Sequence, residues 1–181
     1  QGRLNGINFS SAIFTNFSRD HLDYHKNMKN YFEAKMLLFT KLLKKNKALI
    51  TDQNIKEFKK LKQISNRKKL KLRLISKYET NIEIKNLNLI GEFQKKNLIM
   101  SILASESIGL KRTKIFKCLK KIKTVEGRLQ LVKKFPNKSK IFVDFAHTPE
   151  AIEKTINALK RHFQTNITIV FGCGGERDVE K

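Results

Sequence analysis

Residues 140–175, KIFVDFAHTPEAIEKTINALKRHFQTNITIVFGCGG, decide the fold class of this chain. The run Lys140–Asp144 has the apolar and aromatic character of a strand. Pro149–Phe163 repeats apolar residues at helical spacing, after a Thr-Pro pair that suits a helix start. The apolar run Ile167–Phe171 predicts a second strand, which a glycine-rich stretch follows. Strand, helix, strand and glycine loop predict a βαβ unit, and hence an α/β protein whose ligands bind at the carboxyl ends of parallel strands.

Weaker local patterns predict further elements on the N-terminal side of this unit. A helix over Met28–Leu43 begins with Asn27 as a plausible N-cap. Leucines alternate at 70–74 and isoleucines at 82–84, which predicts a hairpin with its turn near 79–81. The other predicted elements are strands at 12–15, 48–51 and 129–134, and helices at 94–109, which Gly109 ends, and at 113–122.

The chain carries a large excess of positive charge. Its 181 residues include 39 Lys and Arg against 16 Asp and Glu, which gives a net charge of +23 and a pI near 10.2. Such a charge is typical of proteins that bind a polyanion, so a basic nucleic-acid-binding module is one alternative. The lysines are spread along the chain, however, and the densest run, Lys56–Lys71, has the helical rhythm of a surface helix. We therefore expect no nucleic-acid partner.

Three further features of the sequence limit which class of protein this chain can belong to. Cys118 and Cys173 lack metal-ligand spacing, which predicts free thiols in a reducing cytoplasm. No apolar run approaches the roughly 20 residues that cross a bilayer, so we expect no membrane partner. The chain begins with Gln1 rather than Met and stops at Lys181, where a helix should begin. We expect it to be an internal piece of a longer protein.

Lys35 interrupts the apolar side of the helix predicted over 28–43. The apolar positions on that side are Met28, Tyr31, Phe32, Leu38, Phe39 and Leu42. The lysine either lays its stem along this face and reaches solvent, or points its amine into a site. Burial favours the uncharged amine, which takes up carbon dioxide, and the resulting carbamate is an oxygen ligand suited to Mg²⁺. The polar stretch Asp20–His25, just upstream, is a second candidate for metal binding.

Five motifs, in this order along the chain, resemble the Mur ligase family and within it the MurE type. They are Thr15–His25 with Tyr31–Lys35; Gly91–Asn97, similar to G-x-F-N-x-x-N; Glu126–Arg128; Val143–Pro149, similar to V-D-Y-A-H-T-P; and Phe171–Asp178, similar to F-G-C-G-G-D-R-D. The chain departs from these motifs at Phe17, Gln94, Phe145 and Glu176, and none of the four changes removes an essential chemical group. Residues 52–86 carry no part of the resemblance.

The resemblance implies a fold and a division into domains. We expect the second half of a central P-loop-type ATPase domain over residues 1–125, and the start of a Rossmann-like C-terminal domain over residues 126–181. The phosphate-binding motif G-x-x-x-x-G-K-[ST] does not occur in this sequence. The piece alone should therefore be inactive.

The resemblance also implies roles for individual residues. Lys35 is the carbamylated lysine (N6-carboxylysine), a ligand of Mg²⁺, and His21 is the histidine that binds the second of the family's two Mg²⁺ ions. The residues implied at ATP are Asn97, Arg128, Asp144, His147 and Lys181. The residues implied at the substrates are Gln1 and Arg3, for the UDP-N-acetylmuramoyl dipeptide, and Arg177, for the carboxylate of the incoming amino acid. Each side chain also has a plain alternative, as a helix surface, turn, strand end or loop residue.

The implied activity is ATP-dependent formation of an amide bond in peptidoglycan synthesis. The enzyme would add a diamino acid, meso-2,6-diaminopimelate rather than lysine because of the Gly-Cys-Gly-Gly form, through an acyl phosphate. ATP and Mg²⁺ are the implied cofactors, and we expect a cytoplasmic monomer. A related Mur ligase, folylpolyglutamate synthase and a decayed gene fragment remain alternatives.

Overall fold

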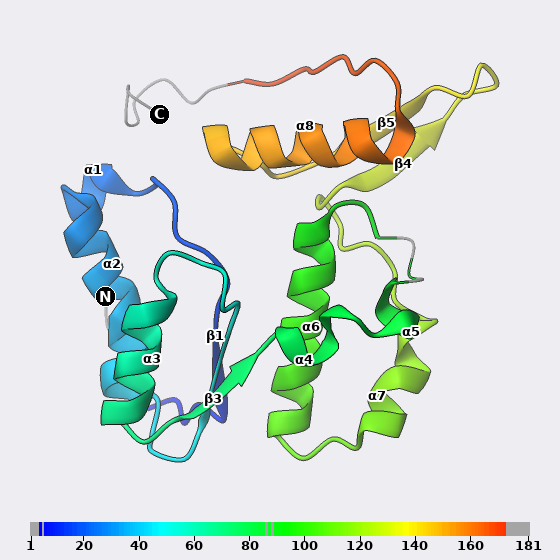
Figure 1. The fold of residues 1–181 in the computed structure, drawn as a ribbon. Helices are drawn as coiled ribbons and strands as arrows, with labels where there is room; N and C mark the ends of the chain where they lie inside the picture. Colours follow the sequence, from blue (N-terminus) through cyan, green and yellow to red (C-terminus); the bar gives the residue numbers. More distant parts are fainter. Residues whose placement is uncertain (1–3, 5, 86, 88, 173–181) are drawn as a thin grey trace.

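A computed structural model describes residue 4 and residues 6–85, 87 and 89–172 of the chain (Figure 1). The elements in chain order are β1 (Ser11–Phe14), α1 (Leu22–His25), α2 (Met28–Leu37), the π-helical turn η1 (Leu38–Leu42), β2 (Ala48–Thr51), α3 (Phe58–Arg67), β3 (Lys71–Leu74), α4 (Ser76–Glu79), α5 (Ile82–Lys85), α6 (Glu92–Ser107), α7 (Arg112–Leu119), β4 (Gln130–Lys134), β5 (Lys140–Val143) and α8 (Pro149–Phe163). The predicted α/β class is confirmed.

A parallel sheet in the order β1-β2-β3 forms the centre of the first part of the chain. Ala12 is paired with Leu49, and Leu49 with Leu72. All four residues of the middle strand β2 are buried, as expected for a parallel strand that helices cover on both faces. The strands predicted at 12–15 and 48–51 are confirmed to within one residue.

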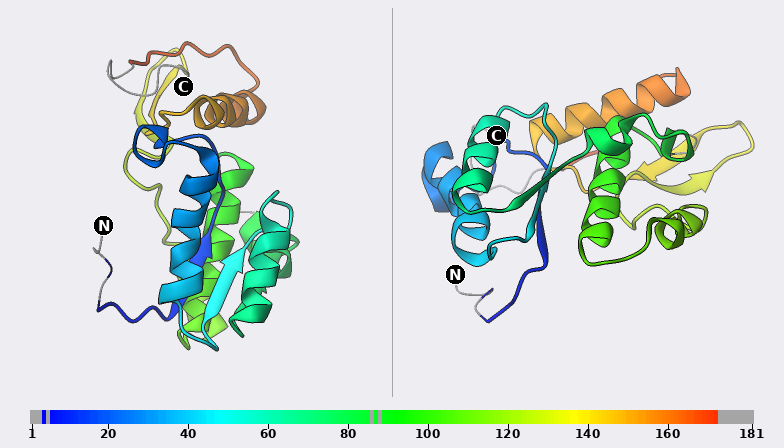
Figure 2. Two further views of the ribbon diagram at one scale, coloured as in Figure 1. Left: turned by 90° about the vertical axis from the view of Figure 1, so that its left-hand side faces the viewer. Right: turned by 60° about the horizontal axis from the view of Figure 1, so that its bottom comes forward.

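Alternate residues of the sheet contribute side chains to two separate hydrophobic clusters. Phe14 and Leu49 pack with residues of α2, η1 and α3 on one face. Ala48 and Ile50 pack with residues of α4, α6 and α7 on the other face. Figure 1 and the right view of Figure 2 show α2 and α3 on one side of the strands and α6 on the other. The result is a three-layer α/β arrangement.

Helix α6 buries one stripe against β1 and β2. Ile99, Met100, Ile102 and Leu103 are at most 3% exposed. Near its C-terminal end, Glu106 accepts hydrogen bonds from Lys77 Nζ (3.1 Å) and Tyr78 Oη. Burial raises the pKa of the Glu106 carboxyl, but these hydrogen bonds and the nearby cations outweigh it and hold that pKa below its usual value. This network ties the end of α6 to α4.

The second part of the described chain is the antiparallel pair β4-β5 together with α8. Thr148 caps α8 by accepting the Ala151 N–H at 3.3 Å, and Pro149 occupies the first turn. Phe142 of β5 packs against Phe163 of α8, with the two rings tilted at 41° and their centroids 5.4 Å apart. Helix α8 crosses the N-terminal end of α6 (Figure 1). The helix predicted over 149–163 is confirmed.

The hairpin predicted between residues 70 and 90 is wrong. Residues 71–74 do form a strand, but β3 pairs in parallel with β2. Residues 82–85 form the short helix α5, whose start Asn81 caps by accepting the Ile84 N–H at 3.1 Å. The prediction failed because two isoleucines at positions 82 and 84 can belong to a strand or to a short helix. Asn81, which caps α5, was the better signal.

The second strand of the predicted βαβ unit, at 167–171, is also absent from the described residues. This stretch has no regular structure, and Val170 and Phe171 are 96% and 69% exposed. A strand needs a neighbour that pairs with its N–H and C=O groups. Among the described residues, β5 is paired with β4, and no strand lies beside 167–171.

None of the helices in the described part of the chain is both long and apolar enough to cross a membrane.

Replacement of Gly91 by Ala should destabilise the protein more than replacement of Gly109 by Ala. Both glycines have positive φ (87° and 92°), so an alanine at either position carries a backbone strain of about 1–2 kcal/mol. A Cβ at Gly91 would also lie 2.8 Å from Ala158 Cβ, whereas a Cβ at Gly109 meets nothing within 4 Å. We expect Gly91→Ala to lower the free energy of unfolding by about 1–3 kcal/mol more than Gly109→Ala, measured by urea denaturation. Equal losses would contradict the close approach of α6 and α8.

Candidate functional site

A cavity of about 730 Å³ opens beside the carboxyl end of β1, between the two parts of the chain. Thr15 and Asn16, which follow β1, form one wall, and α6 forms another. The residues after β5 and the first turns of α8 close it from the other side. Parallel sheets bind ligands at the carboxyl ends of their strands, so this cavity lies where a ligand is expected.

Five of the residues predicted from the sequence meet in this cavity. They come from α2, from α6, from the turn before β4 and from the loop after β5. They are Lys35, Asn97, Arg128, Asp144 and His147. The structure thus brings together residues that are far apart in the sequence.

Lys35 lies at the edge of the buried face of α2. The buried residues of this helix are Tyr31, Phe32 and Met36, so the apolar stripe passes beside Lys35 through Met36. Lys35 follows Tyr31 by four residues and precedes the buried Phe39 by four, so it lies on the buried side of the helix. The lysine is half-buried, and its Nζ lies 5.0 Å from the centroid of the Tyr31 ring. This position places the amine on the cavity wall.

His21 lies next to the cavity rather than in its wall. Its side chain is 59% exposed, and Nε2 lies 3.4 Å from Asp20 Oδ2. Its ring meets the Tyr31 ring edge to face at 5.8 Å, so His21 and Lys35 contact the same tyrosine. Asp20 itself lines the cavity.

A magnesium site is only partly provided by the described residues. Among them, no group of three or more His, Cys, Asp or Glu side chains could hold a metal ion. Asp20 supplies a hard oxygen ligand beside His21, and a carbamate on Lys35 would supply another. Mg²⁺ commonly binds one or two carboxylates and completes its shell with waters and substrate phosphates. The donor set is compatible with that pattern.

His147 joins the two parts of the chain across the cavity. Its Nε2 lies 3.3 Å from Asp20 Oδ2, and its Nδ1 lies 3.0 Å from the carbonyl oxygen of Phe145. Both ring nitrogens therefore lie within hydrogen-bond distance of an oxygen atom. The pair Asp20–His147 is a direct contact between the loop after β1 and the loop after β5.

The Asp144 carboxylate organises the turn that precedes β4. Its Oδ2 accepts the Leu129 N–H at 2.8 Å, and its Oδ1 accepts the Ala146 N–H at 2.8 Å and the Thr155 hydroxyl at 3.3 Å. Leu129 has φ 46° and is 1% exposed, so this hydrogen bond and burial together hold a strained backbone. A carboxylate has about four acceptor directions, so Oδ2 can still accept one donor from a ligand.

Arg128 lies just before this strained residue. Its guanidinium carbon is 5.1 Å from the centroid of the Phe145 ring. Its carbonyl oxygen accepts a hydrogen bond from Gln94 Nε2 at 3.4 Å. The substitution of Gln for the family's Asn at 94 thus provides a contact between α6 and the turn before β4.

Sequence reasoning missed several polar residues of the cavity. Ser101 follows Asn97 by one helical turn, and this spacing was the available signal. For the others, no motif marked their position. They are Thr124 and Lys123 before the turn, and Lys154 and Thr155 on α8.

Four predicted residues, Gln1, Arg3, Arg177 and Lys181, lie outside the described residues.

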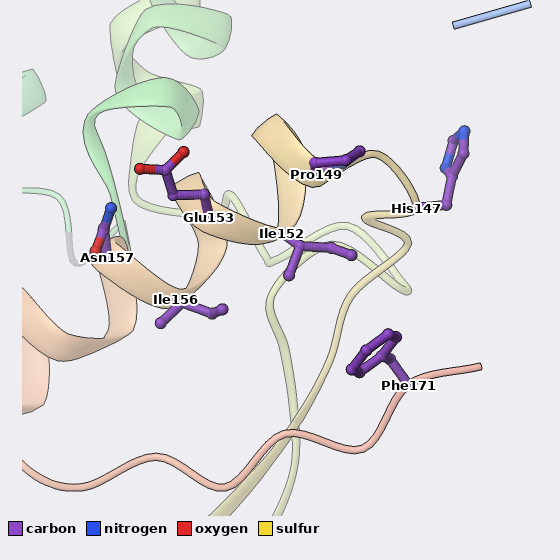
Figure 3. Close-up of a pocket in the computed structure, with 7 residues that line it drawn as sticks. All are labelled: His147, Pro149, Ile152, Glu153, Ile156, Asn157 and Phe171. Carbon is purple, nitrogen blue, oxygen red and sulfur yellow. The ribbon is translucent and has the colours of Figure 1, made fainter. Parts of the chain in front are cut away.

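A second cavity, of about 380 Å³, lies between α8 and the extended segment that follows it (Figure 3). Ile152 and Ile156 of α8 and Phe171 of the segment give it apolar walls, and His147 lies at its rim. The chemical groups of the candidate site lie in the larger cavity.

Comparison with protein families gives two matches in the order in which the chain runs. The profile described as "Mur ligase middle domain" matches residues 1–105. The profile described as "Mur ligase, glutamate ligase domain" matches residues 127–181. The boundary predicted between residues 125 and 126 itself stays a prediction.

Curated relatives share about a third of their residues with this chain. UDP-N-acetylmuramoyl-L-alanyl-D-glutamate–2,6-diaminopimelate ligase of Wigglesworthia glossinidia brevipalpis is 36% identical over 212 residues, which cover 100% of this chain and 41% of the relative. The enzyme of the same name from Rickettsia bellii is 34% identical, with 100% of this chain and 42% of the relative covered. The chain therefore spans about two fifths of the length of these relatives.

Two solved structures are similar to this chain in fold. A structure titled as a UDP-N-acetylmuramoyl-L-alanyl-D-glutamate–2,6-diaminopimelate ligase aligns with a TM-score of 0.67 at 27% identity, over 98% of this chain and 41% of that one. MurF from Acinetobacter baumannii aligns with a TM-score of 0.66 at 15% identity, over 85% of this chain and 38% of that one. At that identity the second match concerns the fold alone.

Replacement of Asp144 by Asn should loosen the turn before β4. An amide offers one acceptor oxygen, so one of the two backbone N–H groups, of Leu129 or Ala146, would lose its partner. We expect the free energy of unfolding to fall by about 1–3 kcal/mol in urea denaturation of the full-length protein. Glu153→Gln, on the exposed surface of α8, is the matched control and should change it by less than about 0.5 kcal/mol. If both variants behave alike, Asp144 does not hold the turn.

Proposed function

This chain belongs to the Mur ligase family, and from that premise we propose that the full-length protein containing it is an ATP-dependent ligase. It adds the third amino acid, meso-2,6-diaminopimelate, to UDP-N-acetylmuramoyl-L-alanyl-D-glutamate in peptidoglycan synthesis. One observation carries the proposal: Lys35, Asn97, Arg128, Asp144 and His147 line a single cavity. The curated relatives named for this reaction support the choice of substrates.

The nucleotide occupies the larger cavity in this proposal. Asn97 on α6 contacts the adenine, and the free acceptor direction of Asp144 Oδ2 takes a ribose hydroxyl. Arg128 and His147 lie on the same side, where Arg128 supplies positive charge near the phosphates. Lys181 is a further candidate at the phosphates.

Lys35 carries a carbamate in the active protein. Its uncharged Nζ attacks the carbon of carbon dioxide, a nitrogen–carbon bond forms, and one proton leaves to solvent. The product is N6-carboxylysine, whose oxygens, together with His21, would hold Mg²⁺. Magnesium bound there would neutralise charge on phosphate oxygens. The half-buried amine above Tyr31 supports this role because it lies on the wall of the cavity.

The reaction couples ATP cleavage to amide-bond formation. A carboxylate oxygen of the dipeptide attacks the γ-phosphorus of ATP, which gives ADP and an acyl phosphate. The amine of the incoming amino acid attacks the acyl carbon and loses a proton, and inorganic phosphate leaves. The protein's part is to position these groups and to offset their charge. Gln1 and Arg3 hold the dipeptide substrate, and Arg177 binds the carboxylate of the amino acid.

The proposal also covers the setting of the enzyme. It works in the cytoplasm as a monomer, without a nucleic-acid or membrane partner. The positive charge is distributed over solvated surfaces such as α3, where only Leu61, Ile64 and Ser65 are buried. Meso-diaminopimelate is favoured over lysine by the Gly172–Gly175 sequence and by the names of the relatives.

The proposal is tested by an assay of the purified full-length protein. We expect ATP-dependent addition of meso-diaminopimelate to the UDP-muramoyl dipeptide, with release of one phosphate per amide bond. Lysine should be added at less than about a hundredth of the rate of meso-diaminopimelate. Its side chain lacks the terminal carboxylate of meso-diaminopimelate, so it cannot pair with an arginine there. Addition of lysine alone would change the assigned substrate. Addition of neither by a folded protein that binds ATP would point to a related ligase, such as folylpolyglutamate synthase.

Replacement of Lys35 by Ala should remove most activity in the same assay. We expect kcat to fall by a factor of about 10²–10³, because an anionic oxygen ligand is lost, with partial return on addition of a short carboxylic acid such as formate. Lys29→Ala is the control, since Lys29 lies on the exposed side of α2. Full activity of the Lys35→Ala variant would refute the carbamate.

A further inference from the structure

Helix α6 presents two adjacent faces to two different environments. Its buried stripe contains Ile99, Met100 and Leu103, which pack in the core beside the sheet. Its cavity face contains Gln94, Asn97, Leu98 and Ser101. Adjacent positions on a helix are about 100° apart, so the rotation of α6 about its axis decides where the cavity face points.

Lys96 continues the buried stripe toward the N-terminal end of α6. It precedes Ile99, Met100 and Leu103 by three, four and seven residues, which places it on their side of the helix. Its Nζ lies 2.5 Å from Asp52 Oδ2, across 44 residues of sequence. In the family motif G-x-F-N-x-x-N, Lys96 occupies a position that the motif leaves open.

Asp52 is a buried carboxylate at the carboxyl end of β2. Its side chain is 3% exposed, and its Oδ1 accepts the Asn54 N–H at 2.8 Å. A buried carboxylate needs a counter-charge, because water cannot stabilise it. Among the described residues, Lys96 provides that charge. The ion pair therefore joins the end of the central strand directly to the first turns of α6.

Apolar contacts alone leave the rotation of a helix loosely defined, because they have no direction. A charged hydrogen bond does have direction, and the Glu106 network fixes only the far end of α6. A rotation of about 20° would move an atom about 6 Å from the helix axis by about 2 Å. Such a shift at Asn97 is larger than a hydrogen bond tolerates.

We propose that the Lys96–Asp52 ion pair sets the rotation of α6 and thereby positions Asn97 and Gln94 for the nucleotide. Lys96 is then a positioning residue, which touches no substrate. This inference rests on the proposed function. It assigns to this chain a positioning contact between residues that the five motifs of the family resemblance do not specify.

Lys95 supplies a matched comparison on the same helix. It also forms an ion pair, but its partner is Glu92 in the first turn of α6, at 3.4 Å. Loss of that pair removes a contact within the helix and leaves the attachment to the sheet intact. A difference between the two neighbouring lysines therefore isolates the contact with Asp52.

The test uses Lys96→Met, Lys96→Arg and Lys95→Met in the full-length protein, with KM for ATP, kcat and the ATP-over-GTP ratio of kcat/KM as readouts. We expect Lys96→Met to raise KM for ATP about tenfold and to change kcat less than about threefold, because groups that bind the nucleotide are displaced while the reacting groups are not. Its preference for ATP over GTP should fall. Lys96→Arg should restore KM to within about threefold, and Lys95→Met should leave it unchanged.

Several results would overturn the proposal. A Lys96→Met variant with unchanged KM and unchanged ATP preference, even one with a lower melting temperature, would reduce the pair to a structural role. Equal effects of Lys96→Met and Lys95→Met would do the same. If the unaltered protein uses no ATP, the proposed function fails separately. In that case, amide hydrogen exchange over residues 97–101 tests whether the ion pair holds α6 in place. Exchange should be faster in Lys96→Met and unchanged in Lys95→Met.

Discussion

The burial of α6 against β1 and β2 is the constraint on which the site depends. The helix contributes Ile99, Met100 and Leu103 to the core, and its neighbouring face forms a wall of the larger cavity. The N-terminal end of α6 also meets α8, because Gly91 allows Ala158 to approach closely. One helix thus connects the parallel sheet, the cavity and the second part of the chain.

The cavity combines residues of opposite charge in a way that suits a nucleotide. Lys123, Arg128 and Lys154 bring positive charge, which phosphates require. Asp144 is committed to two backbone N–H groups and a hydroxyl, and this leaves limited acceptor capacity for a sugar hydroxyl. Asp20 and His147 connect the two sides. A ligand that bridges both parts of the chain would strengthen their contact, because it binds only when they are together.

Local signals in the sequence were sufficient for much of the fold. Asn27 and Thr148 cap their helices as predicted, with side chains that accept the N–H groups of Asn30 and Ala151. The motifs also identified the five cavity residues, although their meeting in one place depends on the fold. Strand pairing was less accessible, because the partner of β3 is β2 rather than the next segment of the chain. Neither the spacing at Ile82 and Ile84 nor the apolar run at 167–171 contains information about available partners.

The site residues that sequence reasoning missed also depend on contacts between segments that are separate in the sequence. Thr155 hydrogen-bonds to Asp144 across one strand-to-helix connection. Lys96 pairs with Asp52 across one strand and the three helices α3, α4 and α5. No periodicity or motif marks such contacts, since both partners read as ordinary polar residues in their own segments. They become visible only when burial and distance are known.

Photolabelling of the full-length protein with 8-azido-ATP, followed by mass spectrometry of the labelled peptides, tests the central claim most directly. The account predicts that label appears in α6, around residues 92–101, or in the facing segments at 122–128 and 144–155, and that excess ATP prevents it. Label confined to other parts of the protein, with α6 and those facing segments unmodified, would contradict the assignment of the larger cavity to the nucleotide.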